Sequence, residues 1–338
     1  MKRKNHLIES IVTADNLRLA FYKACRGKRT TPEVLHLRDN LDDELSKLRS
    51  ELLEGSFVWG PYDSFKVFDP KERLISAAPF MSRVAQHALI NICEPVFEAY
   101  QIFDSHACRK GKGLDAALRR ALSFSRHGDW YLKMDIRKYF DTIDHAVLKD
   151  LLSRRFKDKA VTRLFDSVIA SYATLPGKGA PIGNLTSQYF ANHYLAPLDH
   201  FIKEDLRVRR YVRYMDDFVV WSSSKSELME TNQQIDAFLQ ERLKLILKPV
   251  QINACDRGMT FLGYRIFPHG AGLAKRSRDR FRRKAMLYTK FYEAGLWDEA
   301  EAARHMEPLL AFVRRGASRD FRERVIKECG LCPEARNG

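Results

Sequence analysis

The chain has 338 residues, of which 45% are hydrophobic and 30% are charged, as in a soluble globular protein with a large apolar core. Its 58 Lys and Arg residues outnumber its 43 Asp and Glu residues, and the formal net charge is +15. Such an excess favours a polyanionic partner, most often nucleic acid. An anionic membrane surface or a gain in solubility would also account for the charge.

The distribution of apolar residues and cysteines indicates the compartment. No stretch approaches the roughly 18 consecutive apolar residues of a membrane span, and no apolar run follows the basic N-terminus as it does in a signal peptide. We therefore expect a cytoplasmic protein with no membrane partner, and its six cysteines fit free thiols. Cys329 and Cys332 form a C-x-x-C that would suit half of a zinc site or a redox pair, but no second pair completes it.

Hydrophobic periodicity and chain breakers predict a mixed α+β protein without repeats or long linkers. Helices are predicted over 15–55, 82–98, 114–125, 145–172 (two helices), 184–204 and 226–243. Strands are predicted at 57–59, 65–68, 74–76 and 130–135, then as a hairpin over 209–223 and a strand pair that ends at 261–266. Beyond residue 270 the pattern is helical and basic.

Carboxylates lie at the ends of two of these predicted elements. Asp135 ends the strand 130–135, and Asp216 and Asp217 lie at the turn of the hairpin. An Asp-Asp turn by itself is ordinary turn chemistry. Nucleotidyl transfer, however, uses two divalent metal ions about 4 Å apart, and magnesium takes hard oxygen ligands from only a few carboxylates. A strand-end aspartate that faces a turn with two more supplies such ligands from rigid backbone.

Four segments in fixed order resemble the motifs of reverse transcriptases. They are Asp135–Asp144, Pro181–Gln188, the YxDD segment Tyr214–Asp217, and Phe261–Tyr264. Each is weak alone, but together and in order they are specific. The resemblance implies an α+β right-hand polymerase with fingers, palm and helical thumb, and RNA-directed DNA polymerase activity. It also implies two Mg²⁺ ions at Asp135, Ile136, Asp216 and Asp217, with template RNA, RNA/DNA duplex and deoxynucleoside triphosphates as partners.

The same resemblance assigns the nucleotide-binding residues. Lys66 and Arg73 match the fingers strand that holds the incoming triphosphate, and Arg109 matches the second fingers motif. Surface ion pairs are the alternative for both arginines. Phe140 occupies the position that excludes a 2′-hydroxyl, although a core aromatic is the alternative. Lys248 follows a palm helix where the family has a proton donor to pyrophosphate, but the local match is poor. The remaining predicted contacts come from the second palm motif: Ile182, Gly183 and Gln188.

The basic region after residue 270 predicts contact with a nucleic-acid backbone. Between Lys275 and Lys284 there are seven Lys or Arg residues and one Asp. A solvated helix face is the alternative, but beside a polymerase core we expect these charges to follow phosphates. The residues assigned to this role are Lys275, Arg276, Arg278, Arg282 and Arg283.

The predicted boundaries follow from the motifs. The fingers take 1–130 and an insertion at 145–180. The palm takes 131–144, which holds its first motif, and 181–268. The thumb and C-terminal tail take 269–338.

Within the family, the chain resembles the enzymes of diversity-generating retroelements. It is compact, Ile182 replaces a common Gln, and Asn16-Leu17 precedes Gly27-Lys-Arg29. This resemblance implies copying of a template-repeat RNA with errors at adenines, together with a small basic accessory protein oligomer. Alternatives are an antiviral-defence or group II-like reverse transcriptase. An RNA-binding scaffold without activity is the other alternative, and the intact carboxylates argue against it because like charges held together without metal are costly.

Overall fold

The computed structural model describes residues 6–28, 30–68 and 72–330. Two residues named above, Arg29 and Cys332, lie outside these ranges. The helices and strands are, in chain order, α1 (Ile8–Ile11), α2 (Ala14–Ala24), α3 (Pro32–Asp39), α4 (Leu41–Glu54), β1 (Asp63–Phe68), β2 (Glu72–Ala77), α5 (Phe80–Glu98), α6 (Leu114–Ser125), β3 (Trp130–Asp135), α7 (Tyr139–Thr142), α8 (His145–Ser153), α9 (Lys159–Ala170), α10 (Leu185–His200), a π-helical turn (Phe201–Asp205), β4 (Arg210–Tyr214), β5 (Asp217–Ser222), α11 (Lys225–Leu243), β6 (Gln251–Ala254), a 3₁₀ turn (Cys255–Arg257), β7 (Met259–Phe261), β8 (Tyr264–Phe267), β9 (Gly270–Leu273), α12 (Lys275–Glu293), α13 (Glu299–Arg314) and α14 (Arg319–Glu328).

A four-stranded antiparallel sheet in the order β4-β5-β3-β6 forms the centre of the molecule. Its strands are apolar on both faces, and successive side chains point to opposite sides. Leu132 and Val220 pack into the core that contains α10 and α11, whereas Tyr131 and Val219 pack into the core that contains α6. Because both faces are buried, the pairing register of the strands is fixed by packing.

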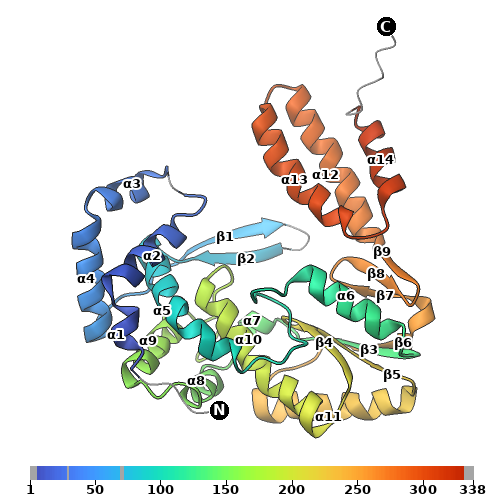
Figure 1. Cartoon of the computed structure of the whole chain (residues 1–338), viewed down its shortest axis with the longest axis horizontal. Helices are drawn as coiled ribbons and strands as arrows, with labels where there is room; N and C mark the ends of the chain where they lie inside the picture. The colour runs from blue at the N-terminus through green and yellow to red at the C-terminus, as the bar shows by residue number, and fades with distance from the viewer. Residues whose placement is uncertain (1–5, 29, 69–71, 331–338) are drawn as a thin grey trace.

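The N-terminal helices α1–α5 pack with α8 and α9 to one side of this sheet, and the hairpin of β1 and β2 extends from them (Figure 1). Asp158 joins the start of α9 to the start of α1. Its side chain caps α9 by accepting from the Ala160 and Val161 N–H groups, and it also accepts from the N–H groups of Leu7 and Ile8 at 2.8 and 3.0 Å. Through these hydrogen bonds, the segment between α7 and α10 is attached to the N-terminal helices.

The C-terminal helices α12, α13 and α14 form a bundle that stands apart from the N-terminal helices (Figure 1). The three-stranded sheet β7-β8-β9 leads into it. One continuous apolar core runs from α6 through this small sheet to Phe281, Val313 and Val325, one residue on each helix of the bundle. Among the described residues, no helix is both long and apolar enough to cross a membrane.

Most predicted elements are present, and two differ. The helix at 114–125 and the strand at 130–135 are confirmed with the predicted bounds. The strand predicted at 57–59 was wrong, because this segment pairs with no strand. Trp59 is instead buried, its Nε1 donates to Ser167 Oγ at 2.8 Å, and the Phe57 ring packs edge-on against it. The helix predicted over 184–204 ends as α-helix at His200 and continues as the π-helical turn.

Candidate active site

Three carboxylates meet at one end of the central sheet. Asp135 is the last residue of β3, and its cross-strand partner is Asp217, the first residue of β5. Asp216 lies in the turn between β4 and β5, directly after Met215, whose φ of 57° is left-handed. Ile136 follows Asp135, is fully buried, and its N–H points to the Asp216 carbonyl oxygen at 3.4 Å. The four residues predicted to hold metal therefore lie together.

Burial and neighbouring charges perturb two of these carboxylates. Burial raises the pKa of Asp217 to about 7, and the charge of Asp135 adds to this rise against the opposing effect of Lys133. Burial and the charge of Asp135 also raise the pKa of Asp216, whereas Lys248 and Arg73 lower it. Oδ1 of Asp217 is buried and has no hydrogen-bond partner among the described residues. A cation bound here would relieve the repulsion and pair this oxygen.

Two lysines reach the carboxylates. Lys248 Nζ lies 2.7 Å from Oδ1 of Asp135, and the backbone N–H of Lys248 donates to the Asp135 carbonyl at 2.9 Å. The structure thus places Lys248 at the site, which the sequence left open. Lys133 Nζ lies 3.3 Å from Oδ2 of Asp217 and donates to the Thr260 carbonyl at 2.9 Å. Sequence reasoning missed Lys133, although its position two residues before Asp135 puts it on the same face of β3.

The carboxylate oxygens at this site could supply some, but not all, of the ligands that a magnesium ion needs. Within the described ranges, no three His, Cys, Asp or Glu side chains form a group able to hold a metal ion by themselves. Magnesium is usually bound through one or two carboxylates, while phosphate and water supply its other ligands. Hard carboxylate oxygens, one of them buried without a partner, fit such a cation that arrives with its substrate.

Backbone contacts bring the predicted nucleotide-binding segments together beside the carboxylates. The N–H of Ser76 on β2 donates to the Ile182 carbonyl at 2.9 Å, and Asn184 Nδ2 donates to the Ser76 carbonyl at 2.7 Å. The N–H of Ala180 donates to the carbonyl of Phe140 at 2.8 Å. The loop before α10 is therefore joined to β2 on one side and to α7 on the other. Phe140 and Ile182 are both half-buried.

Gly183 allows the close approach of this loop to β2. Its φ is +108°, a conformation that side chains rarely adopt, and a Cβ built on it would lie 2.9 Å from Cγ2 of Ile75. Glycine therefore fits this position for both backbone and contact reasons. Gln188 lies half-buried in the first turns of α10.

Arg73 and Lys66 lie on opposite faces of the β1–β2 hairpin. Arg73 pairs with Val67, and Lys66 pairs with Leu74, so the two basic side chains alternate across the ribbon. Arg73 shares its face with Ile75, which lies against Gly183, and its charge acts on Asp216. Lys66 instead forms an ion pair with Glu72 at 2.7 Å. Of the two, only Arg73 acts on Asp216 in this structure, and a triphosphate contact by Lys66 stays a prediction.

Arg109 has a structural role in the described fold. Its Nε donates to Glu98 Oε1 at 2.7 Å, and its Nη1 donates to the carbonyls of Ile102 and Ser105 at 2.6 and 2.5 Å. Its side chain is only 8% exposed. These contacts engage the guanidinium internally, as the ion-pair alternative expects, and a nucleotide or template contact by Arg109 stays a prediction. Cys329 is a buried free thiol, and nothing in the described residues completes a metal site around it.

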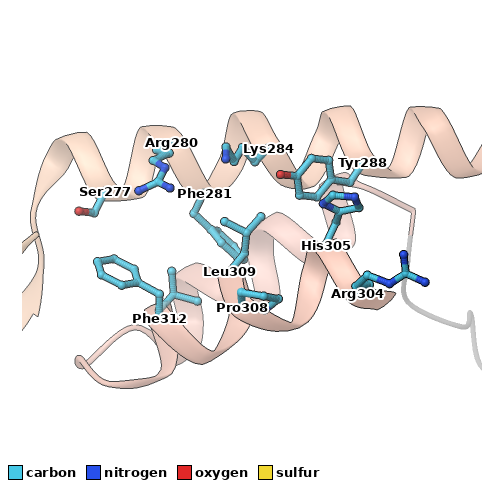
Figure 2. A pocket seen from close by; sticks show the side chains of 11 residues that line it. Ser277, Arg280, Phe281, Lys284, Tyr288, Arg304, His305, Pro308, Leu309 and Phe312 are labelled. Carbon is cyan, nitrogen blue, oxygen red and sulfur yellow. The ribbon is translucent and has the colours of Figure 1, made fainter. Parts of the chain in front are cut away.

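The residues predicted to follow a nucleic-acid backbone all lie on α12 and are exposed: Lys275, Arg276, Arg278, Arg282 and Arg283. Arg282 forms an ion pair with Glu328 of α14 at 2.9 Å. A cavity of about 330 Å³ separates α12 from α13, but other residues line it, among them Arg280, Lys284, Tyr288 and His305 (Figure 2). None of the three aspartates predicted to be catalytic lines this cavity.

Comparisons with known proteins show the family. Residues 68–266, more than half of the chain, match the model of the reverse transcriptase (RNA-dependent DNA polymerase) family. The chain belongs to this family, and its enzyme class is that of the RNA-directed DNA polymerases. Protein YkfC of Escherichia coli (strain K12) is 25% identical over 291 residues, which cover 72% of this chain and 74% of YkfC. The group II intron-encoded protein LtrA of Lactococcus lactis subsp. cremoris is 22% identical over 309 residues, which cover 70% of this chain and 52% of LtrA.

A solved structure supports the fold. The apo telomerase from Candida tropicalis superimposes with a TM-score of 0.54 at 10% sequence identity, covering 80% of this chain and 59% of the telomerase chain. With the family match, this likeness confirms the predicted right-hand polymerase fold. The chain spans about half the length of LtrA and of this telomerase.

Substitution of Gly183 tests how β2 is positioned. Gly183→Ala is expected to lower the free energy of unfolding by about 1–3 kcal/mol through backbone strain, and to raise the KM for deoxynucleotide because its Cβ displaces Ile75 and with it Arg73. Gly177→Ala is the matched control, because Gly177 also has a positive φ of +69° but no atom lies within 4 Å of its added Cβ. Denaturant unfolding and steady-state kinetics measure both effects. An unchanged KM in Gly183→Ala would contradict the role of this contact.

Proposed function

We propose that this enzyme copies an RNA template into DNA, with Asp135, Asp216 and Asp217 as the carboxylates that hold two Mg²⁺ ions. The observation that carries the proposal is the meeting of these side chains at paired strand ends, where burial and neighbouring carboxylates raise the pKa values of Asp216 and Asp217. Burying a carboxylate is costly, and the lysines offset this cost only in part, because Oδ1 of Asp217 has no partner among the described residues. A site that accepts this cost in the free protein is suited to a cation that arrives with the substrate.

Each nearby residue has a role in this proposal. When bound, Mg²⁺ supplies Lewis-acid activation of the primer 3′-hydroxyl and neutralises charge on the triphosphate. Arg73 extends from the β2 face that lies toward Asp216 and binds the triphosphate. Lys248, held at Asp135, donates a proton to the leaving pyrophosphate. The exposed basic residues of α12 contact the phosphates of the RNA/DNA duplex, and such binding weakens steeply with salt.

The regions of the hand follow the predicted boundaries. Residues 1–130 and 145–180 correspond to the fingers, 131–144 and 181–268 to the palm, and 269–338 to the thumb and tail. In support, the central sheet with its carboxylates falls within the palm ranges, apart from Trp130 at the start of β3, and α12 to α14 fall within the thumb range.

Replacement of Asp216 tests the catalytic assignment. Asp216→Asn keeps the shape of the side chain but removes a ligand charge, so extension of a primer on an RNA template is expected to fall by at least about a hundredfold. Asp205→Asn is the control, because Asp205 is an exposed aspartate outside the site. Primer extension with radiolabelled deoxynucleotides, with and without Mg²⁺, measures the rate. Near-normal extension by Asp216→Asn would overturn the assignment.

Phe140 is proposed to select the sugar. Its backbone is joined to the loop that carries Ile182, and its ring is half-buried at the edge of the core, 5.7 Å from the ring of Tyr139. A ring at this place can pack against C2′ of an incoming nucleotide. The fully buried alternative, a core aromatic, fits Tyr139 better, because Tyr139 is 2% exposed.

Phe140→Ala is expected to raise the ratio of ribonucleotide to deoxynucleotide incorporation by about tenfold or more, since a lost steric clash removes a discrimination of at least about 1–3 kcal/mol. Single-nucleotide extension with each nucleotide gives the ratio. Tyr139→Phe serves as the control, because it keeps the neighbouring ring. If the ratio in Phe140→Ala equals that of the unmodified enzyme, Phe140 only packs the core.

The biological role is proposed to be the copying of a template-repeat RNA with errors at adenines, together with a small basic accessory protein oligomer. Support comes from Ile182, whose carbonyl accepts from the Ser76 N–H of β2 and whose side chain lacks the hydrogen-bonding groups that a Gln would offer. Similarity to LtrA, an intron-encoded protein, supports a group II-like role as the alternative. Full copying of the native template from the correct start by the enzyme alone would count against the need for a partner.

Substitution of Ile182 tests the contribution to fidelity. Ile and Gln are close in volume, but Gln restores a donor and an acceptor, and one such hydrogen bond is worth about 0.5–1.5 kcal/mol, or up to roughly tenfold in discrimination. Ile182→Gln is therefore expected to lower misincorporation opposite template adenine more than opposite other bases. Sequencing of cDNA made from one template by both enzymes measures the errors. The alternative, that Ile182 only packs beneath α10, predicts the same adenine error rate in both.

A further inference from the structure

A fully buried ion pair lies behind the catalytic turn. Arg213 on β4 and Asp199 on α10 are both 0% exposed, and two contacts join them: Nε to Oδ1 at 2.7 Å and Nη2 to Oδ2 at 2.5 Å. The hydroxyl of Tyr211 also donates to Asp199 Oδ1 at 2.7 Å. Burying two charges is seldom a net gain in stability over apolar residues of the same volume. Stabilisation of the fold therefore does not explain this ion pair by itself, which indicates another role.

The remaining donors of Arg213 reach the turn. Its Nη1 donates to Asn192 Oδ1 at 3.0 Å and to the carbonyl of Met215 at 3.2 Å. Met215 directly precedes Asp216 and holds the left-handed φ of 57° that closes the turn between β4 and β5. The guanidinium thus binds the peptide group that leads into the catalytic aspartate.

The guanidinium and the backbone of Arg213 are both held in place. Asn192 and Asp199 lie seven positions apart, about two turns, on one face of α10, so a single helix holds the guanidinium at two points. The backbone of Arg213 is held from the other side, because its N–H donates to the Asp104 carbonyl at 2.9 Å and its carbonyl accepts from the His106 N–H at 3.0 Å. The arginine therefore transmits the position of α10 to the turn.

We propose that Arg213 is a positioning residue, which sets the place of Asp216 through the Met215 carbonyl while Asp199 and Asn192 hold its guanidinium. The inference rests on the proposed two-metal role of Asp216. The planar fork of an arginine can pair with a carboxylate and still offer a donor in a different direction, whereas a lysine ammonium offers one point of charge. Arg213→Lys therefore keeps a charge opposite Asp199 and loses the contact to the turn.

The test separates positioning from a merely structural role. Arg213→Lys is expected to lower kcat by roughly ten- to a hundredfold, and to raise the Mg²⁺ concentration for half-maximal rate by about tenfold. The KM for deoxynucleotide and the affinity for the primer–template should stay within about twofold, because neither contact is altered. Asp199→Asn, which keeps the shape of the partner, should shift kcat and the Mg²⁺ midpoint in the same directions. Arg210→Lys, at the opposite end of β4 from the turn, is the matched control.

Thermal unfolding of each variant completes the experiment. A normal kcat and Mg²⁺ midpoint in folded Arg213→Lys would overturn the proposal, as would a loss of kcat with an unchanged Mg²⁺ midpoint. Failure of both Arg213→Lys and Asp199→Asn to fold would also overturn it, because the pair would then be a folding determinant. These outcomes differ from failure of the proposed function, in which the unmodified enzyme makes no DNA on RNA or Asp216→Asn remains active.

Discussion

The pairing of β3 with β5 is the constraint on which the site depends. It places Asp135 opposite Asp217 at the last rung of the ladder, and the tight turn before β5 adds Asp216 beside them. Burial raises the pKa values of Asp216 and Asp217, and repulsion between the neighbouring carboxylates adds to both rises. The sheet can hold them because both of its faces are covered by apolar cores, and slipping by one residue would move every side chain into the opposite core, where it does not fit.

Lysines reduce this repulsion without occupying the whole site. Lys248 pairs with Asp135, and Lys133 pairs with Asp217 while also binding the Thr260 carbonyl on β7. Oδ1 of Asp217 nevertheless keeps no partner in the described residues. The lysines thus lower the cost of holding the carboxylates together at the end of the sheet. The proposed two-metal role would use the charge that the lysines leave unpaired.

The sequence was sufficient for the chemistry at strand ends and insufficient for side-chain direction. Asp135 and the Asp216-Asp217 turn were predictable, because strand, turn and spacing are local patterns. That Lys66 and Arg73 lie on opposite faces of the hairpin could not be predicted, because the strand register sets the face and spacing along the chain does not specify register. The internal contacts of Arg109 could not be predicted for another reason. Its partners, Glu98 and two carbonyls, are fixed by tertiary packing that no motif reveals.

The sequence around Arg213 also predicts a buried ion pair. A charged residue between apolar neighbours in a strand that leads into the Asp216-Asp217 turn implies a buried partner, since an unpaired charge would not be tolerated there. The sequence does not say that the partner is Asp199, on a helix that begins beside Gly183 and the loop joined to β2. The same helix therefore contacts the nucleotide side at its start and the catalytic turn through Asn192 and Asp199. Arg213 joins α10 to the turn, because Asn192 and Asp199 hold its guanidinium while its Nη1 binds the Met215 carbonyl. An apolar pair of equal volume would fill the same space without binding the turn, so the buried charges supply a specific contact that packing alone cannot.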